Sequence, residues 1–471
     1  MNSHNQSMRS HSLDALRGFA ILTMVLSGVI PYGVLPPWMY HAQIPPPDHR
    51  FNPQLPGLTW VDLVFPMFLF ALGAAIPFAL SRRREQGDSA GKIMGSIVQR
   101  GFLLGFFAIF LRHVRPHVLQ ANPQPRHWLI ALAGFALMFP IFARLPGGWP
   151  RWKRGAIRSL GWLVAVLMIA LLRYPDGSGF SLNRSDIIIV VLANMAVFGS
   201  LVWLVTRNNI LLRLGVLAAL LALRLSSAEP GWVQTLWNFS PAPWIFKLYY
   251  LQYLFIVIPG TLVGDVLSQP RQIEPLPSEL DSGLSAWWLF LSMLVATTLV
   301  LLIGLQSRWL WQTAILTLAL TLGAGWLIRR IRGDFGKVIR LLFNWGACWL
   351  WLGLLFEPYE GGIKKDHSTL SYYFVTAGIS TYALIAFSVV IDLFKKQRWV
   401  QLLIDNGKNP MIAYVAFANF IWPILALSGA EKIMLSLTPT PWLGFFRGLF
   451  YTALLALLVS LITRKKIYWR T

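Results

Sequence analysis

The sequence contains little cysteine and little charge. Its 471 residues include a single cysteine, Cys348, which excludes a disulfide framework and a cysteine-rich metal site. Charged residues make up 13% of the chain, about half of the share in a soluble globular protein, whereas 56% of the residues are hydrophobic. This composition excludes an ordinary soluble domain and indicates a membrane protein.

Acidic residues are especially scarce. The chain has 19 Asp and Glu against 41 Lys and Arg, which gives a net charge of +22. The basic residues form no single cationic surface or tail, because they are divided into short clusters between apolar blocks. Topology signals of membrane proteins have this distribution. We therefore expect no nucleic-acid partner.

The apolar blocks are about 16 to 25 residues long, which is enough for a helix to cross a hydrocarbon core of about 30 Å. They predict an all-α polytopic transmembrane bundle with about 11 to 14 spans, of which those near residues 218–223 and 349–351 are the weakest. The basic clusters fall in alternate loops, so the positive-inside rule places both termini in the cytoplasm. We expect a polar tail over residues 1–11 and a single transmembrane domain over residues 12–471.

The histidines gather in the loops that are predicted to lie outside. Six of the eight do so: His41, His49, His113, His117, His127 and His367. Their spacing matches no compact set of metal ligands, and we therefore expect no metal.

The most informative single residue is Asp62, in the segment GLTWVDLVFP that begins the second predicted span. An ionisable group one turn inside a membrane is costly unless it is paired, which makes it a candidate for function. Its natural partner is a histidine of the preceding proline-rich loop, residues 34–56. A carboxylate beside an imidazole orients the ring and raises its basicity, as a general base or nucleophile requires. The alternative is that Asp62 only caps its helix.

A second candidate lies at the cytoplasmic entrance of the first span. Asp14 and Arg17 in SLDALRG are three residues apart and share one helix face. They form either an ion pair that anchors the helix end or a site at which Arg17 binds an anionic group.

Several motifs together resemble a known family. SLDALRG, the loop with proline and histidine, GLTWVDLVFPMFLFALG and DNGKNPMIAYV are similar to the heparan-α-glucosaminide N-acetyltransferase family and its bacterial branch, over nearly the whole chain. The resemblance implies that acetyl-CoA binds from the cytoplasm as a substrate. The acetyl group then passes to a sugar amine on the far side, through a histidine that precedes the Gly-Leu-Thr block.

Transferred to this sequence, the resemblance assigns the catalytic site to Asp62 and a loop histidine. His49 is preferred because it is nearest to the motif, and His41 is the second candidate. Basic side chains pair well with the phosphates of CoA. The residues expected to bind acetyl-CoA are Arg17, Arg82, Arg83, Lys408 and Asn409, the last as a lining residue.

The sequence therefore predicts a transmembrane acetyltransferase of a bacterial cytoplasmic membrane, with an amino sugar or another glycan as acceptor. Two alternatives are a transporter or flippase of a glycan or lipid-linked intermediate, and a non-enzymatic scaffold or sensor. Besides the lipid bilayer and the acceptor, no partner is indicated, and a homodimer is left open.

Overall fold

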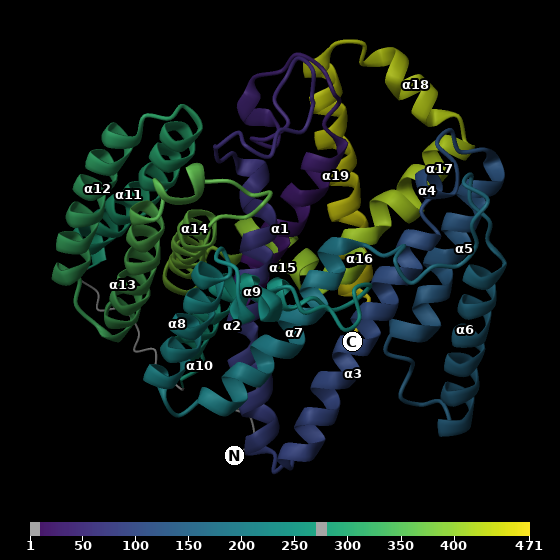
Figure 1. Cartoon of the computed structure of the whole chain (residues 1–471), viewed down its shortest axis with the longest axis horizontal. Coiled ribbons are helices and arrows are strands. Elements are labelled where there is room, and N and C mark those ends of the chain that lie inside the picture. Colours follow the sequence, from purple (N-terminus) through teal and green to yellow (C-terminus); the bar gives the residue numbers. More distant parts are fainter. Residues whose placement is uncertain (1–9, 270–279) are drawn as a thin grey trace.

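The computed structural model describes residues 10–269 and 280–471, and these residues are predominantly helical (Figure 1). The predicted N-terminal tail, except for its last two residues, lies outside the described residues. The helices are α1 (His11–Val29), α2 (Trp60–Glu85), α3 (Ala90–His113), α4 (Pro116–Leu119), α5 (Pro125–Phe142), α6 (Arg151–Leu171), α7 (Ile187–Thr206), α8 (Ile210–Ser226), α9 (Trp232–Trp237), α10 (Leu254–Ser268), α11 (Leu280–Gln306), α12 (Leu310–Arg330), α13 (Asp334–Leu355), α14 (Leu370–Ser388), α15 (Gln401–Lys408), α16 (Pro410–Ala416), α17 (Trp422–Leu427), α18 (Ala430–Leu437) and α19 (Pro441–Arg464). No β-strand forms within these described ranges.

Thirteen helical segments of the described chain are long and apolar enough to cross a membrane. One of them, Pro410–Leu427, is broken: α16 and α17 are joined by a π-helical turn at Phe417–Ile421. The helix α8, at the weak predicted span near residues 218–223, has 17 residues and is slightly shorter than this set. The predicted all-α polytopic bundle is therefore confirmed, and the span count falls within the predicted range.

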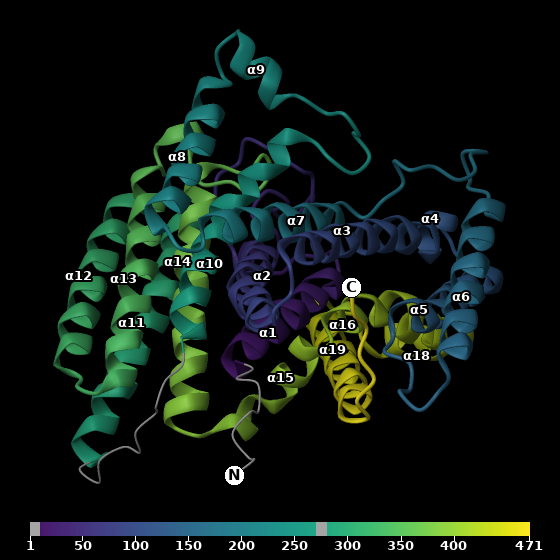
Figure 2. The same cartoon turned by 90° about the horizontal axis from the view of Figure 1, so that it is seen from below.

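The helices α1 and α2 lie at the centre of the molecule (Figures 1 and 2). The helices α10, α14 and α15 pack against this central pair. The helices α11, α12 and α13 form a group on one side and join the rest through α14 and α10, whereas α5 and α6 lie on the opposite side. The loop between α1 and α2 lies at the top of Figure 1, at the end of the molecule opposite the α2–α3 turn.

Two glycines allow α1 and α15 to pack with their backbones in contact. A Cβ atom at Gly18 would overlap the carbonyl group of Leu403, and one at Gly407 would overlap the carbonyl group of Asp14. Small residues permit this close approach between membrane helices. The contact brings Arg17, which follows Asp14 by one turn, next to the end of α15 and Lys408.

Candidate functional site

The imidazole ring of His41 lies between two carboxylates. Its Nδ1 atom is 3.2 Å from Oδ1 of Asp62, and its Nε2 atom is 3.0 Å from Oδ2 of Asp366. The Asp62 side chain is fully buried and that of His41 nearly so, whereas half of the Asp366 side chain is exposed. One side of the ring is thus fixed in the protein interior, and the other faces an accessible surface.

Asp62 also fixes the loop that carries His41. Its Oδ2 atom accepts hydrogen bonds from the backbone N–H of Ala42 at 3.1 Å and from the N–H and hydroxyl of Thr59 at 3.0 and 3.1 Å. The bonds from Thr59 cap the first turn of α2. Both interpretations of Asp62 therefore apply to the geometry: one carboxylate oxygen caps the helix, and the other faces the histidine.

Asp366 reaches the site because two outer loops are joined side by side. The side chain of Gln43 donates to the backbone carbonyl of Asp366, and its Oε1 atom accepts from the Asp366 N–H at 2.8 Å. Burial alone would raise the pKa of the Asp366 carboxyl, but the hydrogen bond from His41 and the charge of Lys365 outweigh it. The net effect is a pKa below the usual value of 3.8, so Asp366 is anionic at neutral pH.

The loop with Asp366 is itself held by a partly buried ion pair. Arg224 of α8 contacts Oε1 of Glu360 at 2.5 Å and donates to the carbonyl of Ser368 at 2.7 Å. The second carboxylate oxygen of Glu360 accepts from the N–H of Leu370 at 2.7 Å. These bonds span the segment that contains Asp366 and fix both of its ends.

His49, the histidine preferred from the sequence, lies apart from Asp62. Its Nε2 atom is 3.1 Å from the carbonyl oxygen of Gly33, and its ring packs edge-on against Tyr32 and Tyr40. Gln43 bonds to the Pro53 carbonyl through its side chain and to the Asn52 N–H through its own carbonyl. The chain between Gln43 and Asn52 therefore forms a loop that projects away from Asp62. His49 lies in this loop and does not contact Asp62, although it is nearer in sequence than His41. The structure places His41, and not His49, beside Asp62, and the catalytic role of either histidine stays a prediction.

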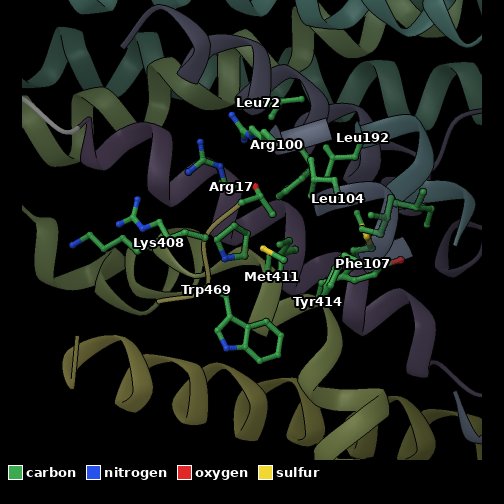
Figure 3. A pocket seen from close by; sticks show the side chains of 18 residues that line it. Arg17, Leu72, Arg100, Leu104, Phe107, Leu192, Lys408, Met411, Tyr414 and Trp469 are labelled. Atoms are coloured by element: carbon green, nitrogen blue, oxygen red, sulfur yellow. The ribbon is translucent and has the colours of Figure 1, made fainter. Parts of the chain in front are cut away.

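A cavity of about 260 Å³ lies among the helices α1, α2, α3, α7 and α16, separate from the His41 cluster (Figure 3). Arg17, Arg100 and Lys408 lie together in this view, and Phe107, Met411 and Tyr414 continue the wall away from them. The cavity therefore has a cationic end and a largely apolar remainder. Arg17 and Lys408 were both predicted to bind the cofactor, and the structure brings them into this one cavity.

Arg100 is a cation within the membrane-length helix α3. Within the described ranges it forms no ion pair, and its buried Nε atom has no hydrogen-bond partner. Arg17 differs, because it pairs with Asp14 at 3.2 Å and donates to the carbonyl of Gly407 at 3.3 Å. A buried cation without a counter-ion is costly, and an anionic ligand in this cavity would compensate it.

The remaining predicted cofactor residues lie outside the cavity lining. Arg82 is exposed in the last turn of α2, and Arg83 pairs there with Asp88 at 2.8 Å. Asn409 is buried beside Lys408 and holds the C-terminal segment, through the Ile467 carbonyl at 2.8 Å and the Trp469 N–H at 3.3 Å. Arg83 thus anchors a helix end and Asn409 the C-terminal segment, and binding of the cofactor by these three residues stays a prediction.

The cavity and the histidine cluster lie at different depths along the same helices. Phe68, which lines the cavity, follows Asp62 by six residues in α2, or about 9 Å along the helix axis. Arg17 lies twelve residues before the end of α1 at Val29, or about 18 Å, and His41 lies in the loop beyond that end. The cationic group and the histidine are thus separated along the direction in which α1 would cross the membrane.

Asp366 and Arg100 are the site residues that sequence reasoning missed. Asp366 lies in the loop KKDHST, and its proximity to His41 depends on the long-range contact with Gln43. Arg100 offered a clearer signal, because a lone arginine within an apolar block is as unfavourable in a membrane as the lone aspartate Asp62. Over the described chain no group of three or more His, Cys, Asp or Glu is arranged to hold a metal ion.

The fold and the site define a class: a polytopic helical membrane protein with a histidine–carboxylate cluster near one end of its central helices and a cationic cavity deeper between them. Residues 9–267 match the family described as "Domain of unknown function (DUF5009)", and the chain belongs to this family.

Two curated proteins are also similar in sequence. The chain is 35% identical over 199 residues to heparan-alpha-glucosaminide N-acetyltransferase of Homo sapiens, and 33% identical over 194 residues to the protein of that name of Mus musculus. Each match covers 36% of this chain and 27% of the relative. The matched part is therefore about a quarter of these relatives, and the resemblance inferred from the motifs is confirmed.

Proposed function

We propose that this protein is a transmembrane acetyltransferase that moves an acetyl group from cytoplasmic acetyl-CoA to an amino sugar or a related glycan on the opposite side. The observation that carries the proposal is the placement of His41 between Asp62 and Asp366, together with a separate cavity lined by Arg17, Arg100 and Lys408. The names of the two similar proteins support the reaction class. The bacterial cytoplasmic membrane is the proposed location.

The His41–Asp366 pair acts as the general base in this proposal. Nε2 of His41 donates to the Asp366 carboxylate, whereas Nδ1 lies 3.2 Å from Asp62 and accepts from the Gln43 N–H at 3.1 Å, so the ring is held in one orientation. Asp62 is buried and fixes the ring orientation, whereas the half-exposed Asp366 marks the side from which an acceptor enters.

The reaction balances with these groups alone. The acceptor amine attacks the thioester carbonyl, a C–N bond forms, and the C–S bond breaks as CoA leaves as a thiolate. Because Nε2–H of His41 already donates to Asp366, the amine proton passes to the half-exposed Asp366 carboxylate of this pair. Lys365, whose Nζ atom is 3.9 Å from Oδ1 of Asp62, adds a positive charge near the carbonyl oxygen on which negative charge develops.

The cavity supplies the donor site. Arg17, Arg100 and Lys408 would pair with the phosphates of acetyl-CoA, and the apolar wall would cover the uncharged arm that carries the acetyl group. The arm would extend along α2 from Phe68 toward Asp62.

The proposal is tested by incubating detergent-purified protein with radiolabelled acetyl-CoA and glucosamine. We expect labelled N-acetylglucosamine from the wild type and from His49→Ala, and a loss of about a hundredfold or more in His41→Ala, as expected when a general base is removed. Without acceptor, radiolabel could remain bound to the wild-type protein but not to His41→Ala. That result would show that His41 carries the acetyl group as an acetyl-histidine intermediate. Full activity in a folded His41→Ala variant would overturn the proposed site.

A further inference from the structure

A second hollow, distinct from the cationic cavity, lies between α11 and the central helices. It has a volume of about 290 Å³ and is bounded by α1, α2, α11 and α14, with Trp60, Leu63, Val295, Leu299 and Ala383 among its lining residues. We call it the lateral groove.

The walls of the lateral groove offer almost nothing polar to a ligand. The hydroxyl of Thr23 donates to the carbonyl of Phe19 at 2.7 Å, and that of Thr298 to the carbonyl of Leu294 at 3.1 Å, so both bond within their own helices. A sugar or phosphate placed there would lose its bonds to water without replacement. A hydrocarbon chain would not, and the groove therefore fits a hydrocarbon chain.

The rim of the lateral groove is open to the surroundings of the spanning helices. Val295 is 53% exposed and Leu299 is 51% exposed, and both lie in the membrane-length part of α11. In a bilayer these side chains face lipid, so a hydrocarbon chain can enter sideways without crossing water.

One end of the lateral groove lies at the depth of the histidine cluster. Trp60 of its wall, in the same first turn of α2 as Asp62, packs against the apolar cluster that contains Tyr40, the residue before His41. Next to this end stands Lys365, a partly exposed cation near the Asp62 carboxylate. An amphiphile with its tail in the groove would therefore place its polar head among His41, Asp366 and Lys365.

The groove and the cationic cavity lie on opposite faces of α1. Arg17, Ile21 and Met24 line the cavity at helical spacing, whereas Phe19 and Thr23 line the groove. A donor and an acceptor could thus occupy the protein together, one on each side of α1, and meet beyond its end at His41.

We propose that the acceptor is lipid-linked: its hydrocarbon chain lies in the lateral groove and its amino-sugar head lies at His41. This inference rests on the proposed acetyltransferase function and specifies the class of its acceptor.

The test compares two acceptors with one head group, methyl glucosaminide and dodecyl glucosaminide. The full chain is placed in nanodiscs of phosphatidylethanolamine and phosphatidylglycerol with radiolabelled acetyl-CoA. The groove is filled by the double substitution Ala383→Leu and Ala386→Leu, since both alanines line it. The matched control is Ala319→Leu, at an exposed position of α12 away from the groove.

We expect the ratio of kcat/KM for the dodecyl acceptor to that for the methyl acceptor to fall at least about fivefold in the filled variant, because an overpacked groove excludes the chain. The control should keep the wild-type ratio. An unchanged ratio in the filled variant would overturn the lipid-linked acceptor and leave the acetyltransferase intact. Acetylation of neither acceptor by the wild type would overturn both proposals.

A second measurement needs no turnover. Dodecyl glucosaminide with a photoreactive group on its chain should label wild-type α11 and α14, and unlabelled dodecyl glucosaminide should compete. Labelling that ordinary phospholipid displaces equally well, or labelling confined to other helices, would contradict a specific acceptor site. Thermal unfolding of each variant shows whether a lost signal reflects a lost fold.

Discussion

At the scale of residues, the site depends on a division of work between two carboxylates. Asp62 is buried and is bonded to the backbone of Ala42 and Thr59, so it sets the position of the His41 loop and of the ring. Asp366 is half exposed and lies on the side of the ring that an acceptor can reach. Removing either should weaken the reaction, but only the loss of Asp62 should also loosen the loop.

The pH dependence of an Asp366→Asn variant separates these roles. The depressed pKa of Asp366 means that its ionised form stabilises the folded protein above the unfolded value near 3.8, and that this contribution is lost as the pH falls through the folded value. We expect Asp366→Asn to lower kcat about a hundredfold, because an amide cannot take the amine proton in place of the carboxylate. The difference in unfolding stability from the wild type should be constant from pH 5 to 8, should shrink as the pH falls below about 3.8, and should vanish only below the folded pKa. A difference that grows as the pH falls would contradict the ionised Asp366.

Among single residues, the sequence predicts those whose importance follows from their immediate neighbours in the chain. Asp62 stands out because an acid inside an apolar block needs a partner, and Arg17 and Lys408 because they sit at helix ends. The choice between His41 and His49 depends instead on how Gln43 ties Pro53 and Asp366 together. Such contacts between distant segments leave no mark in a single sequence.

At the scale of elements, the packing of α1 against α15 shapes the cationic cavity. The spans are predictable because length and apolarity are local properties of the chain. The broken span with the π turn at Phe417–Ile421 and the short helix α15 are not, since tertiary packing decides where such helices stop.

A pair of glycine substitutions in α1 tests this packing. Gly18→Ala places a methyl group against the Leu403 carbonyl, whereas Gly28→Ala meets no atom within 4 Å. We expect Gly18→Ala to lower the free energy of unfolding by about 1 to 3 kcal/mol and to raise KM for acetyl-CoA, because α15 must move and Lys408 with it. Gly28→Ala should leave both unchanged. Equal thermal midpoints and equal KM values for the two variants would show that α1 and α15 are not packed so closely.

At the scale of the whole molecule, the donor and the acceptor are proposed to approach His41 by separate routes. The cationic cavity opens on one face of α1, the lateral groove on the other, and the histidine cluster lies beyond the end of that helix. The positive-inside pattern predicts that the basic loops lie in the cytoplasm and the cluster at the other surface. The proposed reaction across the membrane rests on this predicted orientation.

The central claim is tested most directly by a transfer across a sealed membrane. Purified protein is reconstituted into phospholipid vesicles that contain glucosamine, and radiolabelled acetyl-CoA is supplied only outside. The account predicts labelled N-acetylglucosamine inside the vesicles with the wild type and none with His41→Ala. Product that forms only after detergent opens the vesicles would contradict transfer across the membrane.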